Sequence, residues 1–200
     1  MLMPSKMTYP GIHIDESTTG VHRIIGVATS ITAFVGYTTI GPVNKAVRIS
    51  SFSDFEQKFG SLNRDSEISY AVQQFFLNGG KDAYVVRVVG SDGSPPNNAS
   101  DIIGFYDKRT GIYALLDVDL FNILVIPRTA LLTEQISIDI IGKAASFCEE
   151  RRAFYIIDPD PAKNLTDIAN WAPNLSTSKN AALDFPPIMA EDPLENKSRP

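Results

Sequence analysis

Short buried strands alternate with amphipathic helices in the second half of the sequence, and this order limits the possible folds. The run FNILVIP (121–127) is continuously apolar, which is typical of a strand in a parallel sheet that is covered on both faces. A long helix is predicted from about Thr133 to Arg152, and AFYIIDP (153–159) predicts the next strand. The inner face of this helix is predicted to contain Ile136, Ile140, Ala144, Phe147 and Cys148.

The same order continues towards the C-terminus. A weaker helix is predicted around Leu165, Ile168, Ala169 and Trp171, and AALDFPPI (181–188) predicts a third strand, placed at an edge by its prolines. In such a β-α-β-α-β series we expect right-handed crossovers between parallel strands. We therefore expect an α/β fold with a mixed, largely parallel sheet flanked by helices, and with an extended N-terminal β-arm described below.

The first half adds two strands and a short helix. ITAFVGY (31–37) and AVRIS (46–50) are apolar and rich in β-branched residues, so both predict strands. Ser53 and Glu56 have the spacing of a capping box. They predict the start of a helix that has its phenylalanines on one side and ends at Gly60.

A clearer helix and a further strand follow. Ile68, Ala71, Val72, Phe75 and Phe76 repeat with helical spacing, between a predicted N-cap at Ser66 and a stop at Gly79-Gly80. AYVVRVV (83–89) then predicts a buried strand. The glycine pair lies between a helix and a strand. A phosphate-binding loop requires the opposite order, from a strand through glycines into a helix.

Residues 90–101, GSDGSPPNNASD, predict an exposed loop that tolerates insertion, because they contain turn-forming residues and no apolar anchor. A division of the core into two sub-parts at this loop is left open. The composition also limits the partners. A net charge of −5 argues against nucleic-acid binding. The most apolar early stretch, Ile24 to Val35, is too short to be a membrane anchor.

Few residues suggest catalytic or metal chemistry. Arg128, Asp158 and Asp160 follow predicted strands, and ligands bind beyond the carboxyl ends of parallel strands. These residue types also serve ordinary turns. Asp117 and Asp119 are predicted to lie on one side of an extended segment, where they form either a solvated face or an ion pair between subunits.

We expect no cofactor and no metal site. The single cysteine, Cys148, is predicted to be a buried, inert thiol, and His13 and His22 have no second ligand nearby.

The N-terminus contains strand-forming residues without an obvious partner in the chain. YPGIHIDESTTGV (9–21) has too few apolar residues to bury itself as a hairpin. We therefore interpret residues 1–23 as an extended arm that pairs with another copy of the protein. The predicted intersubunit residues are Tyr9, Pro10, Gly11, Ile12, His13, Ile14, Asp15, Glu16 and Val21.

Five blocks in order resemble the tail sheath proteins of contractile phage tails and contractile injection systems. The blocks are YPGIHIDE (9–16), GVATSITAFVGYTTIGPVNKAVRISSFSDFEQKFG (26–60), SYAVQQFFLNGGKDAYVVRVVG (69–90), TGIYALLDVDLFNILVIP (110–127) and CEERRAFYIIDPD (148–160). The resemblance implies a structural subunit, not an enzyme. Such subunits polymerise around an inner tube and drive it through a target envelope when an extended lattice contracts. The N-terminal arm is implied to add a strand to a neighbouring subunit.

The resemblance also implies partners and a location. The partners are other copies of the chain, the inner tube protein, and baseplate and tail terminator proteins, without nucleic acid or a direct membrane anchor. Assembly is implied in the bacterial cytoplasm, and the product is a virion tail or injection particle. Members of the family continue with a C-terminal domain, so residues 24–200 are expected to be a sheath core that ends before it, as a fragment or a shortened homologue.

Two other interpretations remain open at this stage. One is an α/β hydrolase-like or phosphoester-processing enzyme that uses Asp158, Asp160 and Arg128. The other is a binding module whose arm docks on an unrelated partner.

Overall fold

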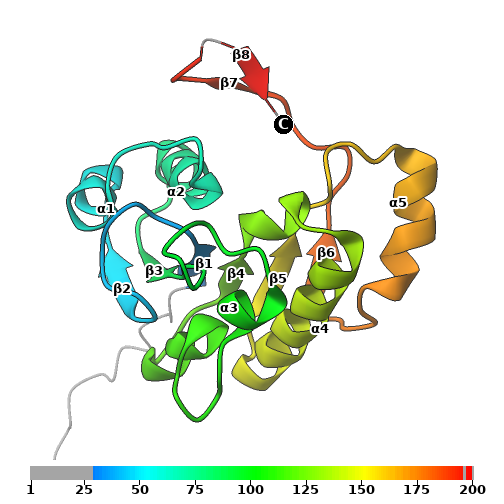
Figure 1. Ribbon diagram of the computed structural model, residues 1–200, viewed down its shortest axis with the longest axis horizontal. Coiled ribbons are helices and arrows are strands. Elements are labelled where there is room, and N and C mark those ends of the chain that lie inside the picture. The colour runs from blue at the N-terminus through cyan, green and yellow to red at the C-terminus, as the bar shows by residue number, and fades with distance from the viewer. Residues whose placement is uncertain (1–28, 196, 200) are drawn as a thin grey trace, which may run out of the picture.

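A six-stranded sheet forms the centre of the computed structural model, which describes residues 29–195 and 197–199 (Figure 1). The strand order is β2-β3-β1-β4-β5-β6, and every pairing is parallel except that of β2 with β3. This confirms the largely parallel α/β sheet. The strands are β1 Thr32–Gly36, β2 Ala46–Ile49, β3 Ala83–Arg87, β4 Ile123–Val125, β5 Phe154–Ile157 and β6 Ala181–Leu183.

Five α-helices and three short 3-10 helices connect the strands of the described chain. The α-helices are α1 Phe52–Phe59, α2 Glu67–Leu77, α3 Ala99–Ile103, α4 Glu134–Arg151 and α5 Leu165–Trp171. The 3-10 helices are η1 Gly111–Asp117, η2 Pro127–Leu131 and η3 Ala172–Asn174. The predicted β-α-β-α-β series is confirmed as β4-α4-β5-α5-β6.

Strand β1 lies in the middle of the sheet and joins the two halves of the chain. Thr32 is paired with Ala83 of β3 on one side and with Ile123 of β4 on the other. All five residues of β1 are buried. Because successive side chains of a strand point to opposite faces, β1 contributes to the cores on both sides of the sheet.

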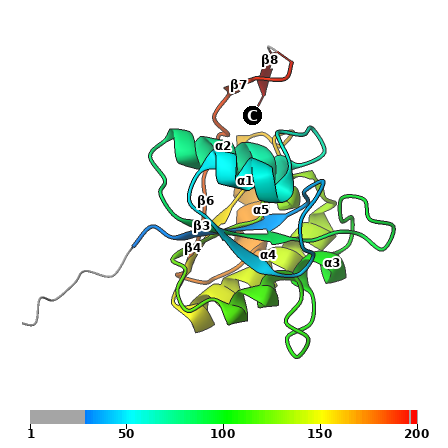
Figure 2. The ribbon, with the colours of Figure 1, turned by 90° about the vertical axis from the view of Figure 1, so that its left-hand side faces the viewer.

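The two faces of the sheet have separate apolar cores. Figure 2 shows α1 and α2 on one side of the sheet and α3 and α4 on the other. Phe34 of β1 packs in the core under α1 and α2, together with the buried Phe55 and Phe59 of α1. Ala33 and Val35 belong to the larger core on the opposite face, which includes Phe147 of α4.

The start of α1 differs from the predicted one. Ser51 is the N-cap, and its hydroxyl accepts a hydrogen bond of 3.1 Å from the backbone N–H of Asp54. Ser53 and Glu56 lie inside the helix, so the predicted capping box is wrong. The helix begins earlier because Phe52 in its first turn stacks on Phe55, with ring centroids 5.8 Å apart.

The interior of α4 contains the cysteine. Cys148 is fully buried, and this burial raises the pKa of its thiol to about 12. The prediction of a buried thiol is therefore confirmed. At neutral pH the group is a neutral thiol, which is a poor nucleophile and a poor metal ligand.

Two segments near loops were not predicted correctly. The predicted loop 90–101 ends at Asn98, because the side chain of Asn98 accepts a hydrogen bond from the N–H of Asp101 and caps α3. Pro96 within the loop is buried, whereas residues 91–93 are exposed. After β6 the chain forms a hairpin of β7 Ala190–Asp192 and β8 Lys197–Arg199, which stands apart from the main sheet in Figure 1.

Candidate functional site

A cleft of about 620 Å³ opens at the carboxyl ends of β5 and β6. One wall is formed by α2, another by η2, and a third by the segment from Pro186 to Asp192 that leads into the hairpin. Ile156, Pro187 and Leu131 are among its apolar lining residues. A hollow of this size and composition is within the usual range for binding sites.

Asp158 follows β5 directly and lines this cleft. Its Oδ2 atom is buried and has no hydrogen-bond partner among the described residues. Burial raises the pKa of the carboxyl to about 6, and the nearby charge of Asp184 adds to the effect. The site therefore holds a carboxylate that has lost much of its hydration without gaining a partner.

Asp184 is another of the carboxylates that line the cleft, and it was not among the residues singled out from the sequence. Ile157 of β5 is paired with Leu183 of β6, so the next residues, Asp158 and Asp184, leave neighbouring strands at the same edge. Asp184 itself is exposed. The predicted edge strand 181–188 was the signal that could have placed it beside Asp158.

Arg128 does not join these carboxylates. Its Nη1 atom lies 2.6 Å from Oε1 of Glu67 in α2, and both side chains are mostly buried. The same guanidinium donates to the carbonyl oxygen of Pro96 at 3.2 Å and to Oδ1 of Asn97 at 2.8 Å. Arg128 therefore links the loop after β3 to α2, and its hydrogen bonds serve this structural role.

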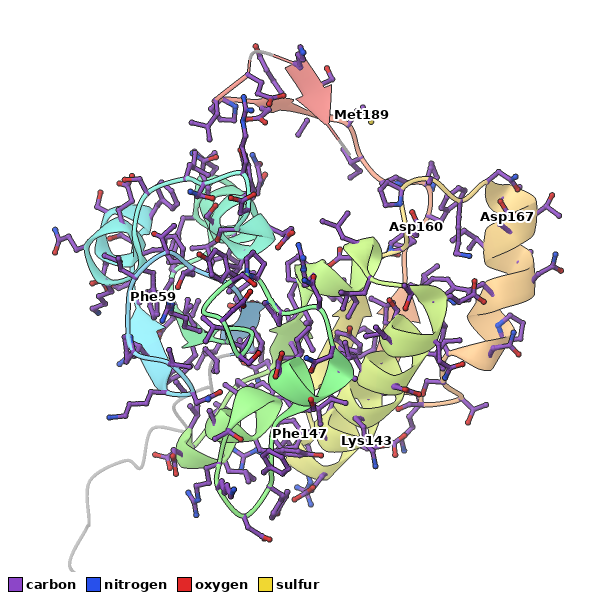
Figure 3. All side chains as sticks on the ribbon, in the orientation of Figure 1. Phe59, Lys143, Phe147, Asp160, Asp167 and Met189 are labelled. Carbon is purple, nitrogen blue, oxygen red and sulfur yellow. The ribbon has the colours of Figure 1, made fainter. Side chains whose placement is uncertain are left out.

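Asp160 lies on the loop between β5 and α5, where Figure 3 labels it. Its Oδ1 atom accepts a hydrogen bond of 2.9 Å from the N–H of Ala162, as an aspartate does in a turn. It lines a second, smaller hollow of about 160 Å³ together with Lys163 and Ser137. The structure thus places Asp158, Asp160 and Arg128 in three different surroundings and does not assemble them into one site.

Other candidate residues have local roles or lie outside the described chain. Asp117 is the last residue of η1 and forms an ion pair with Arg109. The expected extended segment is wrong there, because η1 continues through Asp117; Asp119 is exposed. His13, His22 and the predicted arm residues lie outside the described residues.

No group of three or more histidine, cysteine, aspartate or glutamate side chains among residues 29–195 and 197–199 is arranged to hold a metal ion. Within the same residues, no helix has both the length and the apolarity needed to cross a membrane.

Comparison of the sequence with family models gives one match over most of the chain. A model described as DUF2586, N-terminal domain, matches residues 19–183. No curated protein sequence matches the chain.

Solved structures with a similar fold come from contractile particles. The helical sheath of the anti-feeding prophage in its contracted state matches with a TM-score of 0.59 and 19% identity, over 94% of this chain and 48% of that chain. The contracted sheath complex of PVC, an extracellular contractile injection system, matches with a TM-score of 0.56 and 18% identity, over 90% and 44%. A chain of the contracted anti-feeding prophage baseplate gives 0.57 and 16%, over 89% and 47%.

These matches confirm the resemblance of the fold to contractile sheath proteins. The chain spans about half the length of the solved proteins that it matches.

Proposed function

The chain belongs to the DUF2586 family, and from the fold that it has in common with contractile sheath proteins we propose that it is a subunit of a contractile sheath. The observation that supports this proposal most strongly is the likeness to the anti-feeding prophage sheath over 94% of the chain. In this proposal the subunits polymerise around an inner tube. Contraction of their lattice then drives the tube through a target envelope.

The proposed role is mechanical. Energy for movement would come from the difference in contacts between an extended and a contracted lattice, so the assembly is a bistable one. We propose no catalytic step for the described residues, since Asp158, Asp160 and Arg128 lie in separate surroundings.

The proposed link between subunits is the N-terminal arm, residues 1–23, attached to a core of residues 24–200. In this proposal an extended segment around Tyr9–Glu16 adds a strand to a sheet in a neighbouring copy. Edge strands accept such additions because their N–H and C=O groups are unpaired on one side. Each exchanged backbone hydrogen bond contributes about 0.5–1.5 kcal/mol, so a handful would hold two subunits together while they reorient.

The remaining partners follow from the same role. In this proposal the assembled sheath surrounds the inner tube along its length and meets baseplate and terminator proteins at its two ends. We propose that assembly takes place in the bacterial cytoplasm and that the product is a phage tail or an injection particle.

Electron microscopy of the expressed protein tests this proposal. Regular tubes or striated cylinders are expected for the wild type, and Ile12→Pro should abolish them, because proline removes a donor N–H in the middle of the proposed strand. Ile12→Val is the matched control, since it keeps the N–H and the β-branched side chain. Tubes that form normally with Ile12→Pro would contradict the role of the arm, and a wild type that never forms tubes would contradict the sheath assignment.

A further inference from the structure

The 620 Å³ cleft has apolar walls that are open to solvent. Leu131 at its η2 side is 57% exposed, and Ile188 on the segment leading to the hairpin is 88% exposed. Met189, the next residue, is also exposed and is labelled on that segment in Figure 3. Exposed apolar side chains gathered at the mouth of a hollow are typical of a surface that binds a partner.

The cleft also has negative charge without a matching cation. Arg64 is the one cation among the described residues that line it, and its guanidinium lies 2.5 Å from a carboxylate oxygen of Glu195. Neither Asp158 nor Asp184 has an ion pair among the described residues. A partner that suits this cleft therefore combines apolar side chains with a cationic group.

The loop between α3 and η1, residues 104–110, presents this combination on the surface. Its sequence is GFYDKRT, so it contains two cations and one anion and is cationic overall. Phe105 is 59% exposed, and the Nζ atom of Lys108 lies 5.0 Å from the centre of its ring. Lys108 has no ion pair among the described residues. An exposed aromatic ring and an unpaired ammonium group therefore lie side by side on this loop.

The conformation of this loop is held by its own contacts. The N–H of Phe105 donates to Oγ1 of Thr110 at 2.9 Å, and the N–H of Thr110 donates to the carbonyl oxygen of Phe105 at 3.2 Å. The ring of Tyr106 packs edge-on against Tyr113, and its hydroxyl donates to Oε1 of Glu150 at 3.1 Å. A loop that is already ordered loses little conformational entropy when it binds a partner.

The loop and the cleft lie at opposite ends of the molecule. Figures 1 and 2 both show the green loop that follows α3 at the end away from the hairpin. Helix α4 gives the scale of the separation. It begins close to Leu131 of the cleft, its last turn contains Glu150, the partner of Tyr106, and its 18 residues span about 27 Å. The loop therefore does not reach the cleft of its own copy.

We propose that the loop 104–110 of one subunit docks in the cleft of a second copy, with Phe105 against the apolar walls and Lys108 beside the carboxylates. Because the two surfaces differ and lie at opposite ends, the contact is head-to-tail, and each subunit binds one neighbour at each end. Repetition of such a contact builds an open-ended assembly. This inference rests on the proposed function and adds a contact that is independent of the N-terminal arm.

Binding between two complementary variants tests the proposal. The loop variant, Phe105→Ser with Lys108→Ser, keeps the cleft, and the cleft variant, Asp158→Asn with Asp184→Asn, keeps the loop. Both are full-length proteins that also carry Ile12→Pro, so that the proposed arm does not join them. The immobilised loop variant should bind the soluble cleft variant saturably in biolayer interferometry, whereas each variant should bind itself at least tenfold more weakly.

Two additions to the cleft variant provide the controls. Leu165→Ser with Lys143→Ser removes an exposed apolar side chain and an exposed lysine elsewhere, and should leave binding to the loop variant unchanged. Phe105→Ser with Lys108→Ser should remove that binding. No saturable binding of the complementary pair, or equal binding in every combination, would overturn the proposal. If the pair does not bind although tubes depend on Ile12, the head-to-tail contact is wrong and the sheath assignment stands.

Discussion

Replacing Asp158 by asparagine should stabilise the protein at neutral pH. The carboxyl has a pKa of about 6 in the folded protein and an ordinary value of 3.8. This difference corresponds to about 3 kcal/mol of unfavourable free energy for the ionised group, an upper value because some solvent reaches the site. Asparagine has nearly the same shape and no charge, so Asp158→Asn removes this cost.

The sign of the pH dependence follows from the same values. The folded protein holds the Asp158 proton more tightly than the unfolded chain does. The free energy of unfolding of the wild type therefore falls, relative to the variant, as the pH rises from about 4 to about 6. Above about pH 6 the difference should be constant, at about 1–3 kcal/mol, and near pH 3.5 it should vanish.

Urea denaturation of both proteins at a series of pH values measures this difference, and thermal unfolding at pH 8 should show a melting temperature about 2–12 °C higher for the variant. Asp160→Asn is the control, because an amide oxygen can still accept the hydrogen bond from Ala162. A variant that is less stable than the wild type at pH 8, or a difference that is the same at pH 4 and pH 8, would refute the assignment of an uncompensated buried carboxylate.

Three further predictions concern stability and are measured by urea denaturation. Arg128→Ala should cost about 3 kcal/mol, since it leaves a mostly buried glutamate unpaired. Arg48→Ala, at an ion pair where the arginine is 65% exposed, should cost clearly less, because solvent screens that pair; equal costs would contradict the role of burial. Gly104→Ala should destabilise more than Gly79→Ala, because both have positive φ but only at Gly104 would a Cβ meet neighbouring backbone; equal losses would show that the backbone relaxes there. A short Gly/Ser insertion after Asp92 should change the free energy of unfolding by less than about 1 kcal/mol, because residues 91–93 are exposed; a larger loss would show that this turn packs on the core.

The sequence predicted the elements whose apolar pattern is long and regular. Helix α4 begins and ends within a residue of its predicted range, and its buried side chains include four of the five expected ones. Local patterns were sufficient there because the helix packs on the sheet with the face that its spacing defines. The start of α1 was missed because several serines stand before the phenylalanines, and packing of Phe52 chooses between them.

The cleft could be predicted only in part. Its place at the carboxyl ends of the strands, and the presence of Asp158, follow from the order of strands and helices. The orientation of the Arg128 side chain could not be predicted in this way. Its partner Glu67 is 61 residues away, and the spacing of the sequence gives no sign of that contact. The hairpin of β7 and β8 was missed because its strands are short and mostly polar.

The central position of β1 has a consequence for how the chain reaches its native state. The N–H of Ile31 and the side chain of Asn122 are joined across 91 residues, and β1 has its second partner only when β4 is present. During synthesis the first half of the protein can therefore pair β1 with β3 but must keep the other edge of β1 open until more than 120 residues have been made. Contacts this distant in sequence slow folding, and an open central strand can associate with other chains. For a protein proposed to join its neighbours by exchanging strands, the interval before β4 arrives is when wrong partners compete with the right one.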